Sequence, residues 1–399
     1  MIDFDAHKLI VPQAPPIPLL HDSPHVPHLS QVQVALSPKE RLISVRQLLA
    51  RFPSLALQPT HAATVSFPVQ HVICTGDATP IRMATRRFSP LDHDRIDVAV
   101  TDMLTKGIII PSTIDWVSEP HLVKKDDGTF RFCIDFRPLN KVTIHDLYPL
   151  PRVDDLLDQL GGSRYFTSLD LASGYWQIPL KPSDAHKTAF RTRRGLFQFT
   201  RMSFGLSDAD NTFQHMPNSI FVSLISKGLL LVYLDDIIIH IATWEDHLQT
   251  LVEVLTCITK HNLQLQWKKC RWESTSLRLL DFIISGDGIC MDPTKVVAIT
   301  DYPRPTLIKT LQRFLGMITF SLRFIPNLAL VTFPLRHLLK KGVSFVWDPA
   351  CEDNFRRLKT MVQESGLLNH PNFDQSFMLQ TDASNHGLGA VLLQTDCHW

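Results

Sequence analysis

The sequence lacks the cysteine patterns of disulfide-bonded and zinc-binding proteins. Its 7 cysteines are spread over 399 residues, form no C-x-x-C pair and are odd in number. A disulfide framework needs paired cysteines and a structural zinc site needs closely spaced ligands, so the sequence predicts neither. Unpaired cysteines are typical of an intracellular, reducing compartment.

The sequence also lacks a credible membrane span. The longest apolar run, residues 228–241, is interrupted by Asp235 and Asp236. The first residues, M-I-D-F-D, are acidic where a signal peptide would be basic. We therefore expect no membrane among the partners of this chain.

There is no excess of charge of one sign, because 40 Lys and Arg face 39 Asp and Glu. This balance excludes a uniformly basic nucleic-acid coat but not local basic patches. Two stretches, residues 184–201 and 260–278, each hold five cations against one acidic residue. The cations are Lys187, Arg191, Arg193, Arg194 and Arg201 in the first stretch, and Lys260, Lys268, Lys269, Arg271 and Arg278 in the second. Interleaved aromatic residues make both stretches candidates for a template–primer groove, although such runs are often only solvated faces.

The distribution of proline divides the chain. The first 90 residues contain 12 of the 27 prolines, which predicts a mostly extended linker over residues 1–85, partly disordered, with one short helix around residues 44–52. A folded domain is expected from Ser89-Pro90, where apolar residues take helical spacing up to Gly107, a C-cap glycine.

Beyond that point the pattern is mixed. Short runs rich in β-branched residues predict strands at residues 108–110, 130–134, 165–169, 229–234 and 237–241. Helical periodicity predicts helices at residues 245–261, 310–324 and 351–365, and two further strands are expected at 377–382 and 387–393. Because only two residues separate 229–234 from 237–241, we predict an antiparallel sheet and an α+β fold.

The strongest chemical signal is Asp235-Asp236 between two strongly apolar runs. An acidic pair in a hairpin turn is usually only a solvated turn. Here the flanking runs look buried on both faces, and like charges beside them are costly unless a cation neutralises them. A divalent-metal site is therefore the competing interpretation.

Asp170 follows another apolar strand pattern, in F-T-S-L-D-L-A-S-G-Y-W. By itself it reads as the N-cap of a following helix. Together with Asp235 and Asp236 it would supply a third oxygen ligand from a neighbouring strand, as hard ions such as Mg²⁺ require for phosphoryl transfer.

Four ordered motifs carry a resemblance to a known family. They are L-V-K-K-D-D-G-T-F-R-F-C-I-D-F-R-P-L-N at residues 122–140, and the segments 168–178, 197–214 and 233–237. From about residue 86 to 391 the chain resembles the reverse transcriptases of gypsy-class long-terminal-repeat retrotransposons, which are related to retroviral polymerases. The resemblance implies an intracellular enzyme of the cytoplasm, a virus-like particle or the nucleus.

The resemblance implies a right-hand polymerase fold. Fingers and palm would occupy residues 86–260, with the palm built on the antiparallel sheet. The end of the palm, the primer grip and the start of the thumb would occupy residues 261–300, and thumb and connection helices residues 301–370. Residues 371–399 would be the truncated start of a ribonuclease H-like domain, with Asp382 as its first metal carboxylate. Because that domain is truncated, ribonuclease H activity is not expected.

The implied activity is RNA-directed DNA polymerisation, in which deoxynucleoside triphosphates are added to the 3′-hydroxyl of a primer on an RNA or DNA template. Asp170, Asp235, Asp236 and the backbone carbonyl of Leu171 would hold two Mg²⁺ ions, with Mn²⁺ as a substitute. Lys269 would be a general acid for the pyrophosphate.

Further residues match the family's nucleotide site. Lys124 and Arg131 would clamp the triphosphate from a β-turn, although exposed cations beside Asp-Gly turns are often mere surface. Tyr175 would exclude ribonucleotides by its bulk under the sugar, with a core aromatic as the plain alternative. Phe204 and Gly205 would line the nucleotide pocket with their backbone.

The chain departs from the family pattern at several positions. Ser203 stands in place of a proline, and Asp208 and Asp210 replace a neutral Asn and a Pro, which would put two negative charges near the nucleotide pocket. Asp281 replaces a glycine that we expect in a left-handed turn, and His240 replaces a Tyr or Val. These changes leave open an alternative function, a degenerate and catalytically weak or inactive relic that binds nucleic acid.

Overall fold

The structure is a computed structural model. It describes residues 37–56, 65–113, 115–125, 128–146, 148–325, 327–372, 375–384 and 387–394, and three short strands, β1 (Ile2–Asp3), β2 (Lys8–Leu9) and β3 (Ile17–Pro18). The chain divides into two compact units, Met1–Ile43 and Ser44–Trp399. In the first unit β2 pairs with both β1 and β3 in antiparallel fashion. Of the Pro-rich segment 1–85, which we expected to be partly disordered, residues 57–64 and the remaining residues of 1–36 lie outside the described residues.

Residues 65–85, which the proline content assigned to a linker, contribute to the core. Val65, Val69 and Ile73 are buried, and so is His71, so every second residue faces inward. The backbone amide of Val65 bonds to the Gln177 carbonyl at 3.0 Å. This alternation is the pattern of a half-buried extended segment, which a count of prolines over the whole region does not detect. The short helix expected around residues 44–52 is present as α1 (Pro38–Leu49), followed by α2 (Pro53–Ala56).

A four-stranded antiparallel sheet forms the centre of the second unit, in the order β10-β11-β7-β12. Its strands are β7 (Tyr165–Asp170), β10 (Leu230–Tyr233), β11 (Asp236–Ile241) and β12 (Arg271–Ser274). The sheet and the hairpin of β10 and β11 confirm the prediction made from the two apolar runs.

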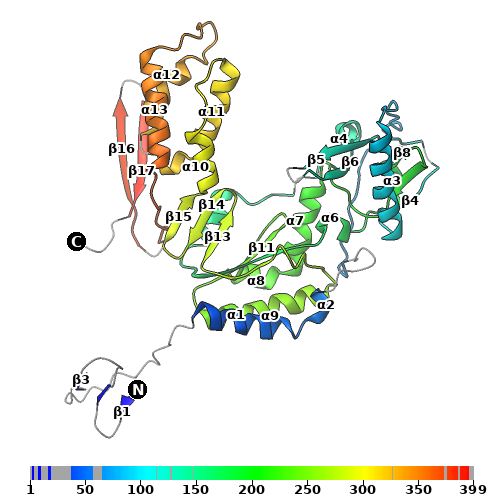
Figure 1. Cartoon of the computed structure of the whole chain (residues 1–399), viewed down its shortest axis with the longest axis horizontal. Helices are drawn as coiled ribbons and strands as arrows, with labels where there is room; N and C mark the ends of the chain where they lie inside the picture. The colour runs from blue at the N-terminus through cyan, green and yellow to red at the C-terminus, as the bar shows by residue number, and fades with distance from the viewer. Residues whose placement is uncertain are drawn as a thin grey trace. The chain divides into compact units, whose positions relative to one another are not determined.

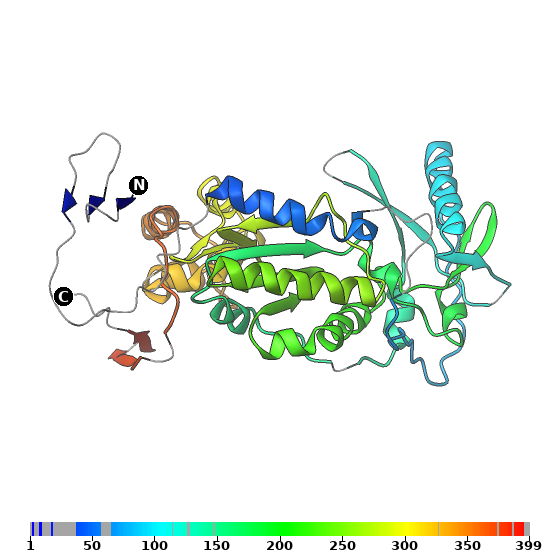
Figure 2. The same ribbon diagram turned by 90° about the horizontal axis from the view of Figure 1, so that it is seen from below.

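Both faces of this sheet are buried, as the uninterrupted apolar runs indicated. Ile237 and Ile239 belong to one hydrophobic core, and Ile238, which points to the opposite face, belongs to another. Helix α9 (Trp244–Lys260) packs on β7 and β11 in the first core, as Figures 1 and 2 show. Because most residues of β7, β10 and β11 are buried against one core or the other, these strands form a rigid platform.

The segment before β7 and the segment between β7 and β10 supply smaller elements. They are α3 (Pro90–Thr105), β4 (Ile109–Pro111), β5 (Pro120–Lys124), β6 (Phe130–Ile134), α4 (Arg137–Val142), α5 (Val153–Gln159), α6 (Gly174–Gln177), the 3-10 helix Ala185–Thr188, β8 (Phe190–Thr192), β9 (Gly195–Phe199), α7 (Ala209–Ile220) and α8 (Val222–Ser226). Strands β5 and β6 form a two-stranded hairpin, and β4, β9 and β8 a three-stranded sheet. Gly107 has a φ of +68° after α3, as its C-cap role requires.

The C-terminal part contains a small sheet, a group of helices and a hairpin. They are β13 (Ser276–Leu279), β14 (Phe282–Ser285), β15 (Gly288–Met291), α10 (Pro293–Thr300), α11 (Ile308–Phe320), the 3-10 helix Leu322–Phe324, α12 (Leu328–His337), α13 (Pro349–Gln363), β16 (Met378–Ser384) and β17 (Gly387–Leu393). Asp281, in the turn between β13 and β14, has a φ of +69°, which confirms the expected left-handed position. Its carboxylate lies 3.1 Å from the Lys295 ammonium.

No helix in the described part of the chain has the length and apolar character needed to cross a membrane.

Candidate active site

Strand register brings two of the predicted carboxylates together. Asp170 is the last residue of β7 and Asp236 the first of β11, and the two are direct partners in the antiparallel ladder. Directly paired residues in such a ladder have Cα atoms about 4.5–5.5 Å apart and side chains on the same face. Two residues 66 positions apart in the sequence therefore carry neighbouring negative charges.

Asp235 belongs to the turn that precedes Asp236. Because Tyr233 pairs with Asp236, the two turn residues are Leu234 and Asp235, one position earlier than the acidic pair suggested. Leu234 has a φ of +49°, a left-handed conformation that costs a non-glycine residue about 1–2 kcal/mol.

The buried amide of Gln214, on α7, holds this strained turn. Its Oε1 accepts a hydrogen bond from the Leu234 amide at 2.8 Å, and its Nε2 donates to the Val232 carbonyl at 2.9 Å. Gln214 is completely buried, so loss of either bond would leave polar groups unpaired. Gln214 closes the motif at residues 197–214, but the sequence analysis assigned it no role.

The carboxylates of the turn repel one another. Partial burial, and next the negative charges of Asp170, Asp236 and Asp210, raise the pKa of Asp235. Burial and the charge of Asp170 likewise raise the pKa of Asp236, although Asp235 and Asp236 are both exposed at the surface. The Lys269 ammonium opposes this repulsion, because it lies 3.3 Å from Asp170 Oδ2.

This donor set fits a divalent cation. The negative charges around Asp235 and Asp236 raise the pKa of both carboxyls, so a positive charge between them would be stabilising, and hard oxygen ligands suit Mg²⁺. Among the described residues, no three Asp, Glu, His or Cys side chains converge as a ready-made metal cluster. Asp170 instead pairs with Lys269, so the side chains would have to reorient around an ion.

The backbone around Asp170 is fixed by residues 264–266. The Gln266 amide donates to the Asp170 carbonyl at 2.8 Å, and the Ala172 amide donates to the Gln264 carbonyl at 2.8 Å. Successive carbonyls of an extended segment point to opposite sides, so the Leu171 carbonyl is directed away from residues 264–266, toward the β11 side. The N-cap interpretation of Asp170 is wrong, because the next helix, α6, begins only at Gly174.

Tyr175 lies in an aromatic stack beside the carboxylates. Its ring is 5.1 Å from Phe213, with an interplanar angle of 15°, and 4.5 Å from Phe204. The residue is only 7% exposed, as the core-aromatic interpretation required, but its hydroxyl donates a short hydrogen bond to Asp210 Oδ1. Burial and this bond raise the pKa of the Tyr175 phenol.

Residues 203–207 form a turn next to this stack. Gly205 has a φ of +89°, which favours glycine, and its carbonyl accepts a hydrogen bond from Asn140 Nδ2 at 2.8 Å. Asn140 Oδ1 accepts from the Ser207 amide at 3.1 Å, so the Asn140 side chain holds the turn at two residues, Gly205 and Ser207. Phe204 at its tip is 41% exposed.

Lys124 and Arg131 lie on the hairpin of β5 and β6, and both are exposed. The expected turn between them is present, since the Lys125 amide bonds to the Thr129 carbonyl at 2.8 Å. The register pairs Val123 with Arg131 and Lys124 with Phe130. Paired residues share a face, so the two cations leave the hairpin on opposite faces, and the structure does not bring them together.

Most cations of the first basic stretch are neutralised by acidic residues. Three of its five cations form ion pairs at 2.7–2.8 Å: Lys187 with Asp184, Arg191 with Glu119, and Arg193 with Asp94 and Asp97. The acidic partners of Arg191 and Arg193 lie 72 to 99 residues earlier in the chain, so a local charge count could not find them. For Lys187, Arg191 and Arg193 the groove expectation is therefore corrected.

The second basic stretch differs. Lys260, Lys268 and Arg271 are exposed, and within the described ranges no carboxylate lies at ion-pair distance from them. The rings of Trp267 and Trp272 lie 5.0 Å apart in the same stretch.

Only one of the two additional acidic residues lies in the site. Asp208 is 6% exposed, and its Oδ1 lies 3.2 Å from His145 Nδ1, on the side of α7 that faces residues 69–74. Asp210 bonds to Tyr175 and acts on Asp235. The expectation that both acids lie near the nucleotide pocket is thus wrong for Asp208.

Comparison with known protein families identifies relatives of this chain. Residues 123–284 match the model of the family described as reverse transcriptase (RNA-dependent DNA polymerase). Residues 123–284 thus form a reverse transcriptase domain. Residues 347–398 match a second model, described as an RNase H-like domain found in reverse transcriptase.

Relatives are similar to most of the chain. It is 36% identical over 362 residues to the retrovirus-related Pol polyprotein from transposon 297 of Drosophila melanogaster, covering 89% of this chain and 34% of that protein. For the Pol polyprotein from transposon gypsy of the same fly, the identity is 36% and the coverage 75% and 31%. The chain thus spans about a third of the length of these relatives.

Solved structures confirm the right-hand polymerase fold. The foamy viral protease-reverse transcriptase, in a structure described as a complex with double-stranded DNA, superposes with a TM-score of 0.80 and 22% identity. The superposition covers 88% of this chain and 62% of that one. The four-stranded sheet that carries Asp170 and Asp236 is the palm of this fold.

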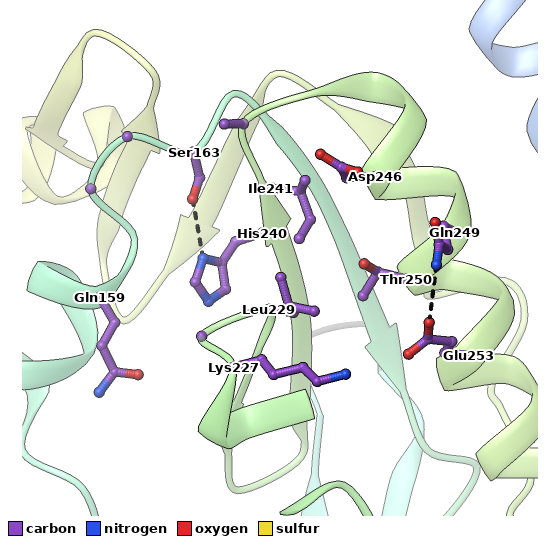
Figure 3. Close-up of a pocket in the computed structure, with 14 residues that line it drawn as sticks. Gln159, Ser163, Lys227, Leu229, His240, Ile241, Asp246, Gln249, Thr250 and Glu253 are labelled. Carbon is purple, nitrogen blue, oxygen red and sulfur yellow. Dashed lines mark hydrogen bonds between the residues drawn. The ribbon is translucent and has the colours of Figure 1, made fainter. Parts of the chain in front are cut away.

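A cavity of about 460 Å³ lies at the other end of the palm sheet. His240 lines this cavity, and its Nδ1 is hydrogen-bonded to Ser163 Oγ at 3.1 Å, as Figure 3 shows. His240 is four residues beyond Asp236 along β11, or about 13 Å at strand rise. The cavity is lined by one cation, Lys227, and by two carboxylates, Asp246 and Glu253. This excess of negative charge does not suit a triphosphate.

Asp382 lies on β16, where it pairs with Gly389 of β17. Its side chain lies outside the described part of the structure, so its proposed metal role remains a prediction.

Proposed function

We propose that this chain is the polymerase of a gypsy-class long-terminal-repeat retrotransposon and adds deoxynucleotides to a primer 3′-hydroxyl on an RNA template. The observation that carries the proposal is the pairing of Asp170 with Asp236, with Asp235 in the adjoining turn, at one end of the palm sheet. Nucleotidyl transfer needs positioned carboxylates at an accessible rim, and all three are at the end of a rigid sheet.

Asp170, Asp235, Asp236 and the Leu171 carbonyl would hold two Mg²⁺ ions, or Mn²⁺ in their place. When bound, these ions would lower the pKa of the primer hydroxyl and offset the charge that develops on the triphosphate. Gln214 keeps the turn with Asp235 in place, and residues 264–266 keep Asp170 and Leu171 in place. The two backbone segments that carry these ligands are thus each fixed by hydrogen bonds.

Lys269 is the proposed proton donor to the leaving pyrophosphate. Its ammonium already lies beside Asp170, which supports a position next to the reacting groups. Once a cation takes over the charge of Asp170, the ammonium is free to turn toward the phosphates.

The nucleotide would lie against Tyr175 and the turn of residues 203–207, which contact each other. Tyr175 supplies a ring under the sugar, and Phe204 and Gly205 the wall beside it. Lys124 and Arg131 would contact the triphosphate from the hairpin of β5 and β6. Since they leave it on opposite faces, a twist of the ribbon at its tip would be needed for both to reach the same phosphate chain.

The exposed cations Lys260, Lys268 and Arg271, next to Trp267 and Trp272, are the proposed contacts to the template–primer backbone. The solved structures described as complexes with double-stranded DNA and with RNA/DNA hybrid support such a duplex as partner. We propose the limits 86–260 for fingers and palm, 261–300 for the end of the palm and start of the thumb, and 301–370 for thumb and connection.

Primer extension on poly(rA)/oligo(dT) with Mg²⁺ or Mn²⁺ tests the proposal. The wild-type chain should extend the primer, and Asp235→Asn should reduce the rate by about a hundredfold or more. Asp287→Asn, in an exposed turn between β14 and β15, is the matched control and should retain the rate. Duplex binding without extension by the wild-type chain would instead favour the inactive relic.

A further inference from the structure

Asp210 contacts the aromatic ring that lies under the proposed sugar position. Its Oδ1 accepts a hydrogen bond from the Tyr175 hydroxyl. Asp210 lies in the first turn of α7, whereas Tyr175 lies on α6, so the bond joins two elements 35 residues apart. Among the described residues, no other hydrogen bond of the Tyr175 hydroxyl is recorded.

The neighbouring aromatic rings fix the plane of the Tyr175 ring but not its position within that plane. Phe213 stacks on one face at 5.1 Å, and Phe204, half exposed, lies 4.5 Å away. Stacked rings slide past each other at low cost, whereas a hydrogen bond at the ring edge fixes one point. Asp210 therefore supplies the lateral constraint.

Asp210 also acts on the metal carboxylates by charge. It is one of the negative groups that raise the pKa of Asp235. A substitution at Asp210 thus has two separable effects, loss of an acceptor for Tyr175 and loss of a negative charge near the triphosphate.

We propose that Asp210 is a positioning residue that holds the Tyr175 ring through its hydroxyl and thereby sets the discrimination between deoxyribonucleotides and ribonucleotides. The inference rests on the proposed polymerase function. A ring that must exclude one hydroxyl group by contact needs sub-ångström placement, and small displacements are enough to relax such selection.

Two substitutions separate the acceptor from the charge. Asp210→Asn keeps an oxygen acceptor and removes the charge, whereas Asp210→Ala removes both. The ratio of kcat/KM for a deoxynucleotide to that for the matching ribonucleotide should fall on the order of three- to tenfold in Asp210→Ala and stay near wild type in Asp210→Asn. Both variants should lower KM for the two sugars alike, because charge repulsion of the triphosphate does not depend on the sugar.

A double-substitution cycle tests whether Tyr175 carries the effect. Tyr175→Phe removes only the hydroxyl and should lower the ratio as Asp210→Ala does, and the double variant should be no worse than either single one. Asp208→Asn, two residues earlier but bonded to His145, is the matched control and should keep the wild-type ratio. An unchanged ratio in Asp210→Ala, or effects that multiply in the double variant, would overturn the inference.

Thermal unfolding separates a failure of this inference from a failure of the proposed function. If the wild-type chain adds no nucleotide of either sugar, the proposed function is wrong and the specificity role falls with it. The hydrogen bond between Asp210 and Tyr175 is then judged from the melting temperatures of wild type, Asp210→Ala, Tyr175→Phe and the double variant. If the melting-temperature shift of the double variant differs from the sum of the two single shifts, Asp210 holds Tyr175. A shift equal to that sum contradicts the inference.

Discussion

Asp235 and Asp236 have a raised pKa in the folded chain, because burial and neighbouring carboxylates disfavour their charged forms. The folded state therefore binds protons more tightly at these residues than the unfolded state does. As pH rises from the ordinary carboxyl pKa of 3.8 through the raised folded pKa, these groups lose protons in the folded state at a cost, and stability decreases. Without a cation, the site destabilises the fold at neutral pH.

Replacing Asp235 by Asn should consequently stabilise the metal-free protein while it abolishes polymerisation. The free energy of unfolding in urea, measured with EDTA at pH 7.5, should be higher for Asp235→Asn than for wild type. Mg²⁺ should raise the melting temperature of the wild-type chain and have a smaller effect on the variant. Equal responses to Mg²⁺ in both proteins would contradict the metal assignment.

Helices α6 and α7 meet at a glycine. A Cβ added to Gly174 would lie 2.6 Å from Phe213 Cε2 and 2.9 Å from Cζ, closer than atoms can approach. Phe213 is fully buried and stacks on Tyr175, so its ring has little room to move. The absence of a side chain at residue 174 thus lets α6 bring Tyr175 onto α7.

Gly174→Ala should destabilise the chain by about 1–3 kcal/mol, the usual cost of overpacking a core, and should relax sugar selection by displacing the stack. Gly316→Ala is the matched control in α11, where an added Cβ meets nothing within 4 Å. It should stabilise the chain by about 0.5–1 kcal/mol, because alanine loses less conformational freedom in a helix. Urea unfolding of both variants measures the difference, and a stabilised Gly174→Ala would contradict the packing argument.

At the scale of the whole molecule, the second unit buries three histidines in neutral form. Burial lowers the pKa of His71, His240 and His247 from 6.5 to about 4. Each is at most 4% exposed, and each has one ring nitrogen bonded to a hydroxyl group, of Thr212, Ser163 and Thr167 in turn. The unfolded chain binds protons at these residues below pH 6.5, whereas the folded chain does so only near pH 4.

The chain should therefore lose stability as pH falls from about 6.5 to about 4. Each histidine contributes roughly 2 kcal/mol of this loss at pH 5. The difference in the free energy of unfolding between pH 7.5 and pH 5 should shrink by about that amount in His247→Gln. His121→Gln, at an exposed position on β5, should leave the difference unchanged. A His247→Gln variant with the wild-type difference would show that His247 titrates normally in the fold.

Much of this protein follows from local sequence. Strands β6 and β17 lie where alternation and β-branched residues predicted them, and α9 lies within one residue of its predicted start and end. These predictions hold because periodicity over 5 to 17 residues records which side of an element is buried. The acidic pair between two apolar runs likewise marked the site without knowledge of the fold.

The tertiary structure decided which charges face one another. Sequence alone could not distinguish Asp208, which turns to His145, from Asp210, which reaches Tyr175, nor find that Glu119 neutralises Arg191. Partners of this kind lie tens of residues apart, and their meeting depends on strand register and helix packing, which no local pattern encodes. Residue types and periodicity thus determined the elements and the reactive groups, whereas long-range packing determined the electrostatic environment in which those groups act.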